Sequence, residues 1–150
     1  MPPIAESRPR RLANRGVEII VLSGDAPDAA YTLLDYRAPP GFAGVQPHWH
    51  AVSTEWFYVI AGTLAWTLGE RSGETPAGGF VEVPPRTHHV WRNASADTPL
   101  HMLIGFDRPH FDDYFRELIA LAERQTTWPP ADPTPWIKLG ERFDTFTGPI

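Results

Sequence analysis

Two histidines one residue apart, followed by a glutamate, lie in the segment QPHWHAVSTEWFYVIAG (46–62). Side chains alternate between the two faces of a strand, so His48 and His50 would project from one face with Cα atoms about 7 Å apart. Imidazole and carboxylate groups are costly to bury without a partner. This combination indicates a place where the groups are held together, and two imidazoles at this separation can converge on one metal ion.

Glu55 lies five residues beyond His50, an odd number, so an unbroken strand would turn its side chain to the opposite face. We therefore expect a bend or bulge within AVST (51–54) if Glu55 joins the two histidines. A further ligand would come from a distant strand, where His88 and His89 are both candidates. These two point to opposite faces, and their spacing alone does not choose between them.

The composition narrows the classes of protein and site. A length of 150 residues suits one domain with a sizeable core. The absence of cysteine excludes disulfides and thiolate ligands, so a metal would be held by nitrogen and oxygen. The net charge of −5 disfavours nucleic acid as the main partner. No signal-peptide pattern is recognised at the first residues, and no apolar run approaches the length of about 20 residues that spans a membrane. We expect a cytoplasmic protein whose partner is a small-molecule substrate, with no nucleic-acid or membrane partner.

Short runs rich in β-branched and aromatic residues alternate with turn sequences along most of the chain. Strands at such regular spacing, with 17 prolines and 12 glycines between and around them, predict an all-β sandwich or barrel. The predicted strands cover residues 17–22, 30–37, 55–62, 63–69, 79–84, 88–93 and 100–106.

The pattern changes on either side of these strands. In PHFDDYFRELIALAER (109–124) apolar residues recur at helical spacing, which predicts one amphipathic helix lying against the β domain. A proline-rich connector precedes WIKLGERF (136–143), which predicts another short helical segment. The sequence thus divides into a flexible, arginine-rich N-terminal arm (1–16), a β domain (17–107) and a C-terminal helix with a proline-rich tail (108–150) that packs on it.

Two spaced patterns contain these histidines. In the first, His48-Trp49-His50 is followed by Glu55 after four residues and Gly62 after six more; in the second, Gly78 is followed by Pro84 after five, His89 after four and Asn93 after three. These patterns resemble the two motifs of the cupin superfamily over residues 41–93, and the flanking strands resemble it more loosely. Two departures lie in turns: Phe42 replaces a glycine six positions before His48, and Arg86 replaces the glycine of the second motif.

This resemblance implies a double-stranded β-helix, the jelly-roll barrel of cupins, with a C-terminal helical appendage and a homodimeric assembly. It selects His89 rather than His88 as the fourth ligand. A set of three imidazoles and one carboxylate suits iron, manganese, nickel, copper, cobalt or zinc, and ligand type does not rank them. The implied metal ligands are His48, His50, Glu55 and His89.

Aromatic residues are candidates for the wall of a substrate pocket, although each could equally be part of the core. Trp91 shares a face with His89, and Phe57 shares one with Glu55, which favours these two. Trp56 and Tyr58 are expected to face away from the metal and to pack under the helix or at a dimer contact. The complete set of pocket candidates is Tyr36, Phe57, Trp66, Trp91 and Phe106.

Three functions remain open. We favour a metal-dependent oxidoreductase of the dioxygenase type on a small aromatic or enolic substrate, with Glu55 as ligand and catalytic proton acceptor, as in flavonol-dioxygenase-like cupins. The second is a non-redox polyketide cyclase or isomerase that uses the metal as a Lewis acid, with His101 as a candidate proton shuttle. His101 is otherwise a hydrogen-bonded histidine of the core or rim. The third function is that of a non-catalytic small-ligand-binding cupin.

Overall fold

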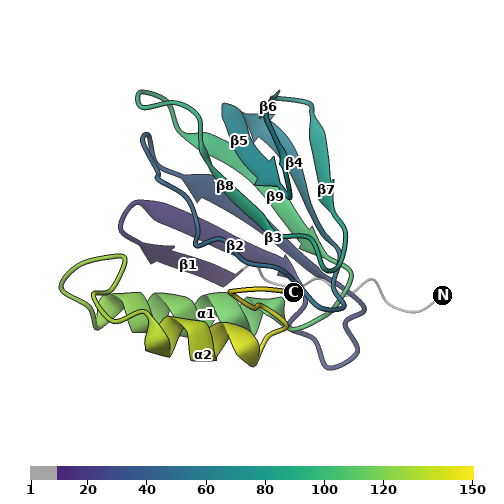
Figure 1. Cartoon of the computed structure of the whole chain (residues 1–150), viewed down its shortest axis with the longest axis vertical. Coiled ribbons are helices and arrows are strands. Elements are labelled where there is room, and N and C mark those ends of the chain that lie inside the picture. Colours follow the sequence, from purple (N-terminus) through teal and green to yellow (C-terminus); the bar gives the residue numbers. More distant parts are fainter. Residues whose placement is uncertain (1–9) are drawn as a thin grey trace.

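The computed structural model of the protein describes residues 10–150, which fold into two antiparallel β-sheets followed by two helices (Figure 1). The larger sheet has six strands in the order β1-β2-β3-β9-β4-β7, and the smaller has three in the order β6-β5-β8. The elements are β1 (Arg10–Asn14), β2 (Val17–Ser23), β3 (Thr32–Ala38), β4 (Glu55–Ala61), β5 (Thr63–Leu68), β6 (Arg71–Pro76), β7 (Phe80–Val83), β8 (His89–Asn93), β9 (Leu100–Phe106), α1 (Phe111–Glu123) and α2 (Thr134–Glu141).

The predicted fold class is confirmed, and each predicted strand and helix has a counterpart in the structure. Two strands were not predicted. Residues 10–14, expected to belong to the N-terminal arm, form β1 and pair with β2, and residues 71–76, expected to form a turn, are β6. Both are edge strands with one neighbour and little buried surface, so neither carries a hydrophobic alternation. The first nine residues of the expected arm lie outside the described residues.

The core lies between the sheets and is built by the inward face of each strand. In β9, Leu100, Met102, Ile104 and Phe106 are buried, with exposures of 3% or less. The alternation of a strand therefore turns His101 to the opposite side of the sheet. Burial of such side chains supplies about 1.5–3 kcal/mol each and holds the two sheets together.

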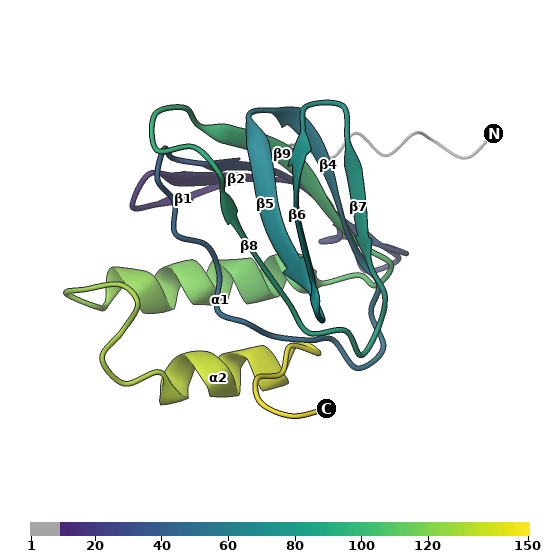
Figure 2. The same cartoon turned by 45° about the horizontal axis from the view of Figure 1, so that its top comes forward.

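Helix α1 packs on the part of the larger sheet that carries β1 and β3, below the two sheets in Figure 2. The Phe111 ring stacks on Phe106, with ring centroids 3.9 Å apart and planes 5° from parallel. Helix α2 lies against α1, and Trp136 donates its Nε1 proton to the Tyr114 hydroxyl at 3.3 Å. Neither helix of the described chain is both long and apolar enough to cross a bilayer.

At two turns, the backbone conformation can be compared with the residue that the motif places there. Gly62 has a φ of 82°, and a Cβ there would lie 2.5 Å from the Pro99 carbonyl oxygen, so this turn requires glycine. Arg86, which replaces a motif glycine, adopts the same left-handed region with a φ of 59°. Its backbone N–H donates to the His50 carbonyl at 2.6 Å. The turn therefore keeps the glycine conformation and remains tied to the histidine segment.

Candidate metal centre and adjoining cavity

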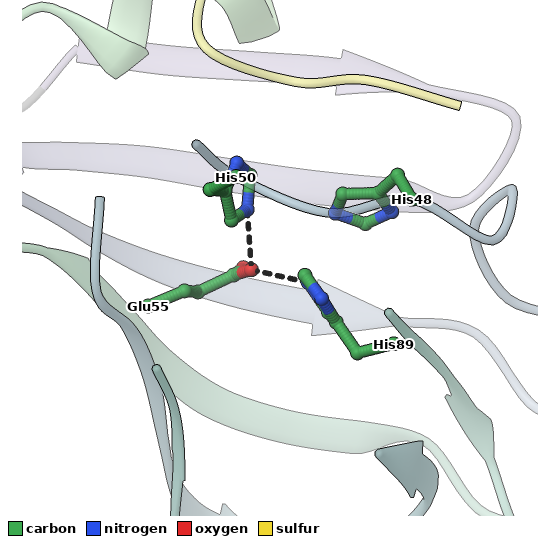
Figure 3. A group of neighbouring side chains, drawn as sticks. All are labelled: His48, His50, Glu55 and His89. Carbon is green, nitrogen blue, oxygen red and sulfur yellow. Dashed lines mark hydrogen bonds and ion pairs between the residues drawn. The ribbon is translucent and has the colours of Figure 1, made fainter. Parts of the chain in front are cut away.

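Four side chains from three separate segments converge between the sheets (Figure 3). His48 and His50 lie on the extended segment before β4, Glu55 begins β4 in the larger sheet, and His89 begins β8 in the smaller sheet. One potential ligand atom from each lies within 4.8 Å of all the others. Glu55 Oε2 is 3.0 Å from His50 Nε2 and 2.8 Å from His89 Nε2. The structure thus brings together the four residues that the sequence proposed as ligands.

The chain bends at residues 51–54, as expected if Glu55 was to share a site with His50. Asp144, which the sequence analysis did not single out, holds this bend. Its carboxylate accepts backbone N–H bonds from Ala51 at 2.8 Å, Val52 at 3.2 Å and Ser53 at 2.9 Å, and a hydroxyl bond from Ser53 at 2.6 Å. These bonds lower the pKa of Asp144, although burial acts in the other direction.

Each of the three histidines is oriented by a backbone carbonyl oxygen. Because a carbonyl oxygen only accepts, the Nδ1 of each ring carries the proton and the Nε2 is directed to the cluster. Metal-binding histidines have the same arrangement, in which the outer nitrogen donates and the inner one ligates. The bonds run from His48 Nδ1 to Gln46 O at 2.7 Å, from His50 Nδ1 to Asp144 O at 2.8 Å and from His89 Nδ1 to Thr87 O at 3.0 Å.

The electrostatics keep two donors in the forms that bind a cation. Burial lowers the pKa of His48 to about 3, with a further lowering by the neighbouring His89, so His48 is neutral. Burial acts to raise the pKa of Glu55, but the contacts of its carboxylate with His50 and His89 outweigh this effect and hold that pKa well below its usual range. Burial acts to lower the pKa of His50, and its bond to Glu55 raises it instead. An ionised carboxylate therefore sits among imidazoles.

The donor set fits the divalent metal that was expected. Nitrogen and oxygen ligands lie about 2.1 Å from such an ion, so neighbouring ligands at right angles are separated by about 3.0 Å. The distances from Glu55 Oε2 to His50 Nε2 and His89 Nε2, 3.0 and 2.8 Å, match this separation. Three imidazole nitrogens and one carboxylate suit a divalent transition metal.

Three of the four donors, His48, His50 and Glu55, line a cavity whose walls are largely apolar. Three of the five aromatic residues proposed for a pocket line it: Tyr36, Trp91 and Phe106. Phe57 is instead 1% exposed in the core, where its ring contacts Trp91 with centroids 6.1 Å apart. The structure does not bring Trp66 to the cavity, because it lines a separate groove on the smaller sheet and donates to Thr75 Oγ1 at 2.9 Å.

The helices and the segment after α2 supply the rest of the wall. The apolar stripe of α1 was recognised in the sequence, but its role as a cavity wall was not. Thr145 and Thr147 stand on a segment with no sequence signal that could have placed them here. The wall residues that the sequence analysis missed include Phe111, Tyr114, Phe115 and Leu118 of α1, Trp136 of α2, and Thr145 and Thr147.

The structure does not bring His101, the candidate proton shuttle, to this cavity. Its Nε2 lies 2.9 Å from both carboxylate oxygens of Asp35, on the face of β9 opposite Ile104. His88 is exposed, and its Nε2 lies 2.6 Å from the Gly148 carbonyl oxygen. These hydrogen-bond partners account for the positions of both histidine side chains, and neither histidine belongs to the group of four donors.

Trp56 and Tyr58 face away from the donors, as expected, but they do not pack under the helix. The Trp56 ring lies against Phe80, with centroids 6.0 Å apart, and Tyr58 is 41% exposed. Helix α1 contacts β1 and β3 at the other side of the larger sheet.

Comparison with known proteins agrees with this architecture. The fold is similar to that of Lactobacillus farciminis oxalate decarboxylase in complex with formate (TM-score 0.57, 21% identity, covering 68% of this chain and 32% of that one). It is also similar to Bacillus subtilis oxalate decarboxylase, a protein with Mn(II) centres (TM-score 0.57, 22% identity, 67% and 28%). At these identities the likeness concerns the fold, and this chain spans less than a third of each neighbour. No curated protein matches the sequence.

The family is indicated by the sequence itself. Residues 35–106 match the family model for the cupin domain. This range contains both sequence motifs and all four donors of the cluster. The match identifies residues 35–106 as a cupin domain.

Proposed function

We propose that this cupin is a metal-dependent enzyme of the dioxygenase type that acts on a small aromatic or enolic substrate. The observation that carries the proposal is the opening of a three-histidine, one-glutamate cluster onto a cavity walled by aromatic side chains. A purely structural metal site is closed by its ligands and has no adjoining cavity. The donors here face a space that a ligand can enter.

The chemistry of the wall favours an apolar substrate over a small dianion. Oxalate, the substrate named for the structural neighbours, carries two negative charges that are costly to bury without cationic partners. Among the described residues that line this cavity there is no lysine or arginine. Aromatic rings stack favourably on other aromatic rings, so an aromatic or enolic molecule suits this wall.

A bound divalent metal would supply Lewis acidity and, if redox-active, electron transfer to dioxygen. The residues of the chain would bind the substrate and accept its proton. Glu55 Oε1 bonds neither His50 nor His89, which leaves this oxygen free to accept the proton of an enol or phenol. Burial raises the pKa of Tyr114 to about 12, so its phenol stays protonated and can donate a hydrogen bond to a substrate oxygen.

Metal content and oxygen consumption test this function. The protein should be purified without a nickel column or chelator, analysed for its elements, and assayed for oxygen uptake with phenolic and enolic compounds. We expect near-stoichiometric redox-active metal and substrate-dependent uptake that Glu55→Gln abolishes in metal-loaded protein. Product formation without oxygen would replace the proposal with the cyclase or isomerase function. Binding without any turnover would leave a ligand-binding cupin.

We also propose a homodimer formed by the outer face of β4 and β7. Tyr58, Ile60 and Phe80 are exposed there by 41%, 40% and 57%, and together with Trp56 they form a continuous apolar surface. Phe80→Glu should convert the dimer to a monomer, as measured by sedimentation velocity, because a buried unpaired charge opposes association. Tyr31→Glu, at another exposed aromatic, is the matched control. A monomeric wild-type protein, or a dimeric Phe80→Glu variant, would contradict this arrangement.

A further inference from the structure

We propose that the cavity over the metal donors continues into a second chamber, which binds the apolar body of an elongated substrate while its oxygen-bearing head reaches the donors. This inference rests on the proposed function and specifies its substrate class. The two cavities lie side by side because they share lining residues from β3, the 42–46 loop and both helices. The shared residues are Tyr36, Val45, Gln46, Phe115, Leu118 and Trp136.

The sizes of the two spaces require the substrate to extend. The inner cavity, which holds the donors, has a volume of about 70 Å³, and the outer chamber has about 480 Å³. An engineered protein cavity of about 150 Å³ is known to bind benzene. The inner cavity is smaller than that, so it accommodates the head of an aromatic substrate and the remainder must lie in the outer chamber.

The outer chamber is apolar along its length. Val17 and Ile19 of β2 line one side, Ile119 and Ala122 of α1 line another, and Trp128 also contributes to the lining. In Figure 2, α1 runs beneath the larger sheet, to which β2 belongs. Contact with such walls favours rings or an aliphatic chain, since each buried apolar Å² contributes about 25 cal/mol.

The few polar groups of the chamber also restrict the substrate. Its described lining includes no aspartate or glutamate, and its one cation is Arg15, an exposed residue. Arg15 Nη2 donates to the Gln125 carbonyl oxygen at 2.8 Å, which ties the connector after α1 to the turn between β1 and β2. A neutral or anionic far end is therefore compatible with the chamber, and a cationic one is disfavoured. The substrate class is an elongated apolar molecule with a hydroxy-carbonyl head.

Two probes with the same head test the chamber. Maltol and 3-hydroxyflavone share a 3-hydroxy-4-pyrone, but only 3-hydroxyflavone carries a fused ring and a phenyl group. Both would be titrated anaerobically into metal-loaded protein, which prevents turnover. We expect wild-type protein to bind 3-hydroxyflavone at least tenfold more tightly than maltol. Ile119→Trp, which adds an indole to the outer chamber alone, should weaken 3-hydroxyflavone binding at least tenfold and change maltol binding less than twofold.

The matched control is Ile20→Trp, the same substitution at a half-buried isoleucine on the opposite face of β2 from Ile19. It should leave both affinities unchanged. If circular dichroism shows that the Ile119→Trp variant does not fold, Val17→Phe can replace it, because Val17 lines the same chamber from β2. Equal affinities of wild-type protein for the two probes, or equal weakening of both by the substitution, would overturn the second chamber and leave the proposed function standing. Binding of neither probe would overturn both.

Discussion

His89→Ala should lower the affinity of the protein for its metal by more than about 100-fold, a loss that exceeds the roughly 10–100-fold cost of removing an outer partner of a ligand. The His89 imidazole is 3% exposed, its Nδ1 is fixed by the Thr87 carbonyl, and its Nε2 lies 2.8 Å from Glu55 Oε2. Alanine removes one of the four donors and leaves the carboxylate with one histidine partner. Competition with a chromophoric chelator measures the affinity, and elemental analysis measures the metal content.

The adjacent histidine provides the control for this prediction. His88 is exposed and its ring nitrogen lies against the Gly148 carbonyl, outside the donor cluster. His88→Ala should therefore retain the wild-type metal content and change the affinity less than about threefold. Stoichiometric metal in His89→Ala, or loss of metal in His88→Ala, would show that the ligands are assigned incorrectly.

Asp144→Ala should destabilise the protein by about 2–4 kcal/mol in the free energy of unfolding, and it should lower the metal affinity by about 10–100-fold. The first effect follows because the Asp144 carboxylate is the partner of three backbone N–H groups and one hydroxyl in residues 51–53. The second follows because these residues connect His50 to Glu55. Chemical denaturation of the metal-free protein measures the stability, and chelator competition measures the affinity.

Two further variants separate the causes of this effect. Asp144 has a φ of 51°, a conformation that asparagine tolerates, so Asp144→Asn keeps the backbone and removes only the charge and one acceptor. Asp144→Asn should therefore lose less stability and less metal affinity than Asp144→Ala. Asp132→Ala changes an exposed aspartate whose carboxylate accepts the Thr134 N–H at the start of α2, and it should leave the metal affinity unchanged. A wild-type metal affinity in Asp144→Ala would mean that residues 51–54 keep their bend without the Asp144 carboxylate.

The strands could be predicted wherever one face is buried and the other is not. Phe57 and Val59, which share a face with Glu55, are 1% and 0% exposed. The same alternation turns His101 away from the core, because the buried apolar residues Leu100, Met102, Ile104 and Phe106 occupy the even positions of β9. The edge strands β1 and β6 could not be found this way, because neither buries a continuous face.

The site could be predicted only in its local parts. The spacing of His48, His50 and Glu55 required a bend, which the structure contains. The choice of His89 over His88 came from a family resemblance, since a one-residue shift in a strand reverses the face and spacing alone allows both. Asp144 had no sequence signal: it lies 94 residues beyond His50, and only the path of the folded chain brings it to the bend.

The distance in sequence between His50 and Asp144 also sets an order of events during synthesis. A ribosome delivers all nine strands of the described chain before it adds the residue that fixes the His50 ring and the bend beside it. A nascent chain that already carries all four donors therefore lacks the support that orients one of them. Metal loading at full affinity must therefore follow translation of the segment after α2.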